Sequence, residues 1–167
     1  MSIYLNNPYF CFMSTSTNLR WVTKTFAELT VNELYDLLKL RSEVFVVEQN
    51  CIFLDMDNND QKAYHTIGFL GEEVVATTRL FDKNIMYDDY QSIGRVVGSP
   101  KYRGLGIGKA LMQYSIQECE RLFGKGPIKI GAQLYLKKFY NEQGFEQSGG
   151  VYLEDEIDHI PMIRAEK

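Results

Sequence analysis

The sequence predicts one α/β domain built on a mixed sheet with helices on both faces. The first observation is the order of apolar patterns, which reads as strand, helix, three strands, helix, strand, helix and two strands. The second is the length of 167 residues, which suits one hydrophobic core and is short for two ordinary domains. The third is that no repeat, low-complexity tract or flexible linker divides the chain.

A strand and a long helix open the predicted domain. Residues 19–25 read as the strand, and Thr30 with Glu33 then has the spacing of a capping box at a helix start. An apolar helical pattern follows this box. Its members are Leu34, Leu37, Leu38 and Phe45.

Three strands come next, and the first two are expected to form a hairpin. Residues 64–70 and 74–81 have alternating or continuous apolar patterns, and the turn signal Gly71-Glu72 lies between them. A further strand is expected at residues 92–97. The chain then enters a glycine-rich turn and a second helix, whose apolar positions recur at helical spacing from Ile107 to Leu122.

The last third of the predicted domain alternates strand and helix. Residues 128–130 begin a strand with a buried pattern, and residues 134–143 read as a short helix that Gly144 ends. Two strands are expected at 145–152 and 159–164. Residues 1–18 are predicted to be an extension outside the core, with Met13 as a second plausible start, so that the domain covers residues 19–167.

Composition narrows the class of function. A formal net charge of -4 argues against nucleic acid as a partner, because binding along phosphates needs clustered Lys and Arg. Three cysteines without CxxC spacing are the wrong count for a disulfide framework, and no Lys or Arg precedes Arg20 to start a signal peptide. No stretch is apolar enough to span a membrane. We expect a cytoplasmic protein that does not bind membranes.

The glycine-rich turn is the most informative segment. Gly104, Gly106 and Gly108 remove side chains between a strand and a helix, so that backbone N–H groups and the helix dipole can meet an anion there. A P-loop needs a different spacing and a Ser or Thr after the lysine, whereas Lys109 precedes Ala110. A dinucleotide fingerprint fits poorly too, because the spacing is G-x-G-x-G and the turn comes late in the chain. The alternative is a tight turn whose glycines serve packing alone.

The segment from Arg103 to Gly108 matches the Q/R-x-x-G-x-G/A signature and resembles the GNAT superfamily of N-acetyltransferases. Residues 128–134 and 139–145 resemble the strand and short helix that complete the coenzyme A cleft of that superfamily. Four further segments look like its ElaA-like branch, and the resemblance covers residues 19–164. They are RSEVFVVEQNC (41–51), IGRVV (93–97), Ala132-Gln133 and YLEDEIDHIPM (152–162).

The resemblance implies a fold, a reaction and a cofactor site. The implied fold is the acyl-CoA N-acyltransferase fold, a twisted and largely antiparallel sheet of six to seven strands. The implied reaction is transfer of an acetyl group from acetyl-CoA to a primary amine in a ternary complex, without a metal. Backbone N–H groups near Val96 and Val97 would hold the pantetheine and polarise the thioester carbonyl. The implied coenzyme A site comprises Val96, Val97, Arg103, Gly104, Leu105, Gly106, Ile107, Gly108, Lys109 and Gln133.

The implied catalytic residues are Tyr140, Glu48 and Asp155. Tyr140 stands where many family members use a tyrosine hydroxyl to protonate the departing thiolate, although a packing role beside Phe139 and Phe145 is the alternative. A base must deprotonate the amine, and the family architecture favours Glu48, Glu154 and Asp155. The full set of candidate bases is Glu48, Asp55, Asp57, His65, Glu154, Asp155 and His159.

Several other readings of these residues are weaker. The two histidines have no further ligands at metal spacing and read as structural. The acidic run from Asp55 lacks the Gly and the Glu of a calcium loop. Cys51 reads as packing because no His stands in a recognisable relation to it.

Three functions stay open at this point. The first is an enzyme for small amines, the second an enzyme for peptide or protein amines, and the third a coenzyme A binding module without turnover. A homodimer is compatible with such a fold.

Overall fold

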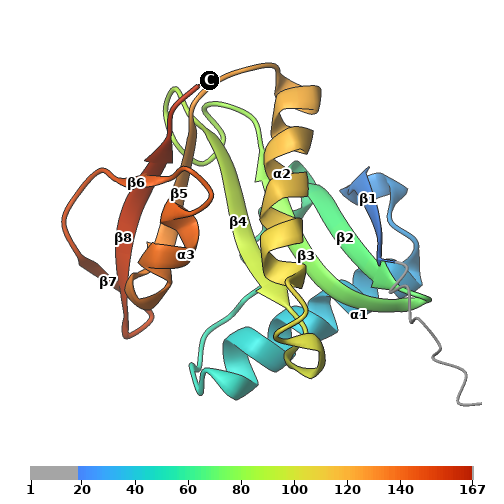
Figure 1. Ribbon diagram of the computed structural model, residues 1–167. Helices are drawn as coiled ribbons and strands as arrows, with labels where there is room; N and C mark the ends of the chain where they lie inside the picture. Colours follow the sequence, from blue (N-terminus) through green and yellow to red (C-terminus); the bar gives the residue numbers. More distant parts are fainter. Residues whose placement is uncertain (1–18, 167) are drawn as a thin grey trace, which may run out of the picture.

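The computed structural model describes residues 19–166, which form one sheet with helices on both faces (Figure 1). The helices are α1 (Val31–Arg41), α2 (Ile107–Phe123) and α3 (Lys137–Asn141). The strand order is β1-β2-β3-β4-β5-β8-β6, and β7 also pairs with β8. The strands are β1 (Leu19–Thr25), β2 (Tyr64–Leu70), β3 (Glu73–Phe81), β4 (Gln91–Gly98), β5 (Ile128–Gln133), β6 (Glu146–Gln147), β7 (Tyr152–Glu154) and β8 (Ile157–Arg164).

One pair of neighbouring strands is parallel, and it separates almost at once. β4 and β5 pair only where Gln91 faces Ile128 and Ser92 faces Lys129, whereas the other neighbours in the sheet are antiparallel. β4 also carries an extra residue against β3, because Arg79 faces Gly94 while Thr77 faces Val97. Beyond Ser92 the two strands therefore leave a gap in the middle of the sheet (Figure 1).

The two long helices cover opposite faces of the sheet. On one face α1 packs through Leu37 and Leu40 against a cluster that includes Ile67 and Val97. On the other face α2 packs through Met112 in a cluster with residues of β3, β4, β5 and β8. Burial of these side chains supplies the main favourable term in folding, at about 25 cal/mol per Å² of apolar surface.

The predicted fold class is confirmed, and the elements follow the expected order with three differences. The sheet has eight strands, because the strand expected at 145–152 is two short strands that both pair with β8. Gly149 separates them, and a Cβ on it would lie 2.7 Å from the Pro161 side chain, so the chain approaches β8 too closely for a larger residue. The first helix continues as a π-helical segment, Ser42–Glu48, and the third begins as a 3₁₀ turn, Leu134–Leu136.

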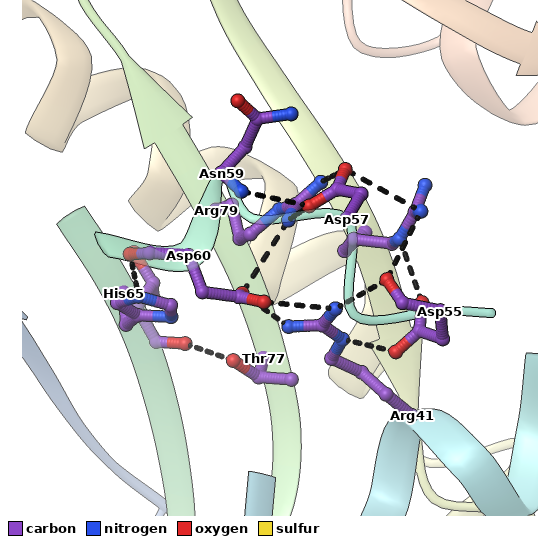
Figure 2. A network of polar contacts seen from close by, with 10 residues as sticks. Arg41, Asp55, Asp57, Asn59, Asp60, His65, Thr77 and Arg79 are labelled. Atoms are coloured by element: carbon purple, nitrogen blue, oxygen red, sulfur yellow. Dashed lines mark hydrogen bonds and ion pairs between the residues drawn. The ribbon is translucent and has the colours of Figure 1, made fainter. Parts of the chain in front are cut away.

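The loop after the π-helical segment is fixed to the sheet by a buried ionic network (Figure 2). Arg41 is 1% exposed; its Nε donates to Asp55 at 2.7 Å, and its Nη1 forms an ion pair with Asp60. His65 lies beneath the loop, where its Nε2 donates to the Asp60 carbonyl at 2.9 Å. Since α1 carries Arg41 and β2 carries His65, the network joins the helix, the loop and the sheet.

Two further arginines complete this network from the sheet side. Arg79 on β3 holds both carboxylate oxygens of Asp57, at 2.6 and 2.8 Å. Arg95 on β4 donates from Nε to Asp55 at 2.7 Å. Arg95 has a φ of 49°, in the left-handed region that non-glycine residues seldom adopt. The ion pair therefore holds the strained residue at the bulge of β4.

We expect Asp60→Asn to lower the free energy of unfolding by about 3 kcal/mol, because it leaves Arg41 and Arg79 buried without a shared anion. Urea denaturation measures the change. The matched control is Asp88→Asn on an exposed loop, which should stay within about 0.5 kcal/mol of the parent. Equal effects of the two substitutions would show that the network does not stabilise the fold.

Candidate active site

The glycine-rich turn forms an open cradle at the start of α2. Gly104 and Gly106 have φ values of 82° and 75°, which glycine adopts without steric cost, and Gly106 caps the helix. Apart from the adjacent residues, no atom of residues 19–166 lies within 4 Å of a Cβ built on either glycine. The first N–H groups of a helix lack intrahelical partners, and here they face open space. The cradle therefore suits an anion such as a phosphate.

A cavity of about 710 Å³ extends from this cradle to the gap between β4 and β5, and we call it the turn cavity. Nine of the ten residues predicted to bind coenzyme A line it, while Leu105 is 61% exposed and lies outside the lining. The nine are Val96, Val97, Arg103, Gly104, Gly106, Ile107, Gly108, Lys109 and Gln133. Residues far apart in sequence thus meet around one elongated space.

A second cavity of about 500 Å³ lies on the other side of the gap, beside the turn between β7 and β8. We call it the hairpin cavity. Its walls come from the bulge of β4, from β5, from the loop held by the ionic network and from the β7–β8 turn. The two cavities meet where the parallel strands part. The residues that line both are Phe45, Gln49, Val96, Gln133, Leu136 and Tyr140.

Tyr140 lies at this junction and is 6% exposed. Burial, with a smaller contribution from Tyr135, raises the pKa of its hydroxyl above the ordinary value, so the group is protonated at neutral pH. Its ring also meets Phe139 and Phe145 edge to face. Tyr140 therefore packs in the core and also lines the junction of the two cavities.

The structure places Glu48 on the cradle side, away from the hairpin cavity. Its two carboxylate oxygens accept from Nη2 of Arg103 at 2.6 and 2.8 Å, and both side chains are exposed. Glu48 lines only the turn cavity. Its position thus fits a partner of the cradle arginine better than a base for an amine in the hairpin cavity.

Sequence reasoning missed the glutamine pair at the junction. Gln49 and Gln133 exchange side-chain hydrogen bonds of 3.4 and 3.2 Å, and the Tyr135 hydroxyl donates to Gln133 at 2.6 Å. These contacts tie the end of the π-helical segment to β5 across the gap. The sequence signal for this pair was that Gln49 lies in the segment 41–51 that carried the family resemblance. Its partner Gln133 is 84 positions away, so the pairing itself could not be read from the sequence.

The candidate bases divide by position. Asp55 and His65 belong to the buried network and do not line the hairpin cavity. Asp57 does line it, but the hydrogen bonds from Arg79 lower the pKa of Asp57 far below its usual range, which makes it a weak base. The three candidates that line this cavity without such pairing are Glu154, Asp155 and His159.

His159 has a defined tautomer. Its Nδ1 lies 2.8 Å from the carbonyl of Ile157, which can only accept, so Nδ1 carries the proton. Nε2 of the neutral ring is then free to accept a proton. The Tyr152 ring lies 5.7 Å from the imidazole and helps to fix its orientation. His159 therefore keeps both roles considered from the sequence, a structural histidine and a candidate base.

Cys51 lines the hairpin cavity, with its thiol engaged. Sγ donates to the carbonyl of Asp155 at 3.2 Å, which links the loop to the β7–β8 turn. Burial, together with the charges of Asp155 and Glu156, raises the pKa of the thiol. A protonated thiol is a poor nucleophile, which agrees with the packing role predicted from the sequence.

Within residues 19–166 no group of three or more His, Cys, Asp or Glu side chains is arranged to hold a metal ion. The described helices include none long and apolar enough to cross a membrane.

The parted parallel strands, with a cavity on each side of the gap, agree with the acyl-CoA N-acyltransferase fold that the resemblance implied. The chain belongs to the GNAT acetyltransferase family, since residues 72–165 match its acetyltransferase domain. It is 39% identical to protein ElaA of Escherichia coli over 150 residues, covering 87% of this chain and 96% of that protein. The protein is therefore an acetyltransferase that depends on acetyl-CoA.

Solved structures agree with this assignment. An acyl-CoA N-acyltransferase from Pseudomonas aeruginosa is 41% identical with a TM-score of 0.81, over 87% of this chain and 99% of that one. The crystal structure of Escherichia coli ElaA gives the same coverage and TM-score at 38% identity. An acetyltransferase of Bacillus subtilis solved with CoA shares the fold at 20% identity, with a TM-score of 0.62 over 88% of this chain and 98% of that one.

We expect Glu48→Gln to tighten acetyl-CoA binding by roughly two- to fivefold, because an exposed ion pair with Arg103 competes with the anionic cofactor. Isothermal titration calorimetry at low salt measures the change. Glu43→Gln, exposed on the same segment and outside both cavities, is the control. Weaker binding by Glu48→Gln alone would show instead that Glu48 supports the cofactor.

Proposed function

We propose that the protein transfers the acetyl group of acetyl-CoA directly to the primary amine of a small molecule, with both substrates bound together. The observation that carries this proposal is the meeting of the turn cavity and the hairpin cavity at Tyr140. Two substrates that occupy the two cavities can meet there without a covalent enzyme intermediate. Proximity of this kind lowers the barrier of a two-substrate reaction.

In this proposal the pyrophosphate occupies the cradle and the pantetheine follows the gap between β4 and β5. Arg103 and Lys109 add positive charge beside the N–H groups from Gly104 to Gly108, and Leu105 contributes through its backbone alone. Of the backbone N–H groups near Val96 and Val97, the one on the edge of β4 that β5 has left polarises the thioester carbonyl. Gln133, held by Gln49 and Tyr135, orients the pantetheine at the junction.

The chemistry then needs one base and one acid. The free amine attacks the thioester carbon, and collapse of the tetrahedral intermediate breaks the carbon–sulfur bond and releases a thiolate. Tyr140 donates its proton to that thiolate, since burial keeps the hydroxyl protonated. We assign the role of base to Nε2 of His159. In this assignment Asp155 attracts the ammonium form of the acceptor, and Glu48 forms an ion pair with Arg103.

The size and shape of the hairpin cavity favour a small acceptor. About 500 Å³ falls in the range of pockets that enclose a small molecule, whereas a peptide requires an extended groove. A peptide or protein amine is the alternative acceptor, and a binding module without turnover is the alternative of another class.

The direct test is steady-state kinetics on a panel of small amines and amino-terminal peptides, with CoA release as the readout. We expect a small amine to be acetylated with intersecting initial-velocity lines, because a ternary complex forms. Parallel lines would contradict direct transfer, and the absence of any acetylated acceptor would contradict the proposed function. Tyr140→Phe is the matched variant: acetyl-CoA binding should persist while kcat falls roughly 100-fold. An unchanged kcat would show that Tyr140 has only a packing role.

We expect His159→Gln to lower kcat/KM roughly 100-fold at neutral pH, because the acceptor must then arrive already deprotonated. Its rate should climb with pH toward the pKa of the amine more steeply than that of the parent. The pH profile of kcat/KM measures this. His65→Gln, in the network outside the cavity, is the control for loss of an imidazole. Parallel profiles for His159→Gln and the parent would exclude His159 as the base.

A further inference from the structure

The charges around the hairpin cavity divide into a balanced set and an unbalanced set. The balanced set comprises three arginines paired with three aspartates. They are Arg41, Arg79 and Arg95 with Asp55, Asp57 and Asp60. The unbalanced set is Glu154 and Asp155 at the β7–β8 turn, which form no ion pair within residues 19–166. The cavity therefore keeps an excess of negative charge at that turn, which favours cations.

Two tyrosine hydroxyls converge near this charge. A Cβ built on Gly131 of β5 would lie 2.5 Å from Oη of Tyr152 and 3.6 Å from Oη of Tyr87. Gly131 and Tyr87 line the hairpin cavity, and the bare backbone of Gly131 leaves room for the hydroxyls of both tyrosines beside it. Sequence analysis gave no role to this glycine or to either tyrosine.

The charge of Glu154 reaches both hydroxyls. Burial and then Glu154 raise the pKa of Tyr87, and the same two causes lead in raising the pKa of Tyr152 to about 12. Glu154 and the two neutral tyrosines therefore form a set of oxygen acceptors and aromatic faces, which is the chemistry that recognises an ammonium group.

One cation of the chain already uses part of this surface. Lys129 Nζ lies 4.8 Å from the centre of the Tyr87 ring and 5.5 Å from that of Tyr90. It does not line the hairpin cavity and makes no ion pair with Glu154. Lys129 thus places one cation against the Tyr87 ring, while Glu154 forms no ion pair within residues 19–166.

The spacing between the junction and Gly131 suits an apolar connector. Gly131 lies two residues before Gln133 on β5, so roughly 7 Å of strand separates it from the reaction centre. The cavity walls along this path include the apolar side chains of Phe53, Leu54 and Met86. An alkyl chain would bury its methylene groups there, at about 0.8 kcal/mol per group.

We propose, on the basis of the proposed function, that the acceptor is a dication: a diamine whose second ammonium group lies between Glu154, Tyr87 and Tyr152. One nitrogen reacts at the junction, and the other stays protonated at the far end of the cavity. A monoamine of the same length leaves Glu154 without a partner. An amino acid of the same length brings a carboxylate toward Glu154, which repels it.

The test compares 1,6-diaminohexane, hexylamine and 6-aminohexanoate as acceptors for the full chain with acetyl-CoA. We expect the diamine to have a kcat/KM roughly tenfold above that of hexylamine, with 6-aminohexanoate the poorest. Glu154→Gln should remove the preference for the diamine, so that the kcat/KM of this variant for the diamine falls to its kcat/KM for hexylamine. Glu156→Gln, in the same turn but outside the cavity lining, should keep the preference.

A second readout separates this inference from the proposed function. Calorimetric titration of the acetyl-CoA-free protein with the diamine measures the cation site without turnover, and Glu154→Gln should weaken that binding roughly tenfold. If all three acceptors were acetylated with equal kcat/KM, the inference that the acceptor is a dication would be wrong, and the proposed acetyltransferase function would still hold. Selective diamine binding without acetylation of any amine would support the cation site and contradict the proposed function. Failure of the diamine to bind or react would overturn the inference.

Discussion

The early separation of β4 from β5 is the constraint on which the site depends. Two parallel register pairs, Gln91 with Ile128 and Ser92 with Lys129, bring the strands together, and both cavities lie beyond that point. If the two strands were paired along their full length, the N–H groups on the β5 edge of β4 would be used in sheet hydrogen bonds. The extra residue of β4 helps to prevent such pairing. It shifts the alternation of backbone N–H and C=O groups along the strand, and it forces Arg95 into a left-handed conformation.

The ionic network explains how that separation is maintained. Buried ion pairs contribute little net stability, because the loss of hydration offsets the attraction. They do specify geometry, since each carboxylate here accepts from guanidinium groups in fixed directions. Asp55 is shared by Arg41 of α1 and Arg95 of the bulge, so it couples the covering helix to the strained strand (Figure 2). The network thus gives the hairpin cavity a rigid wall without leaving net charge in it.

How much the sequence could predict follows from the range of the interactions. The cradle was predictable because its glycines, the strand before it and the helix after it lie within one local stretch. The partners of Glu48 and Gln49 were not, because Arg103 and Gln133 are 55 and 84 positions distant. The order of elements followed from apolar periodicity, whereas the division of the strand at 145–152 depended on the close approach of Gly149 to Pro161. The tautomer of His159 depends on backbone geometry that no pattern of residue types encodes.

The opposite polarity of the two cavities bears on turnover as well as on recognition. Under the proposed function, the turn cavity offers Arg103, Lys109 and the N-terminus of α2 to an anionic cofactor. The hairpin cavity would offer a cationic acceptor the carboxylates of Glu154 and Asp155, which form no ion pair within residues 19–166. Each substrate is therefore disfavoured on the wrong side of the gap. Acetylation converts an ammonium group into a neutral amide, so the product loses one positive charge within the hairpin cavity. The attraction that draws the acceptor in is thereby weakened by the reaction itself, which favours release of the product from the carboxylate side.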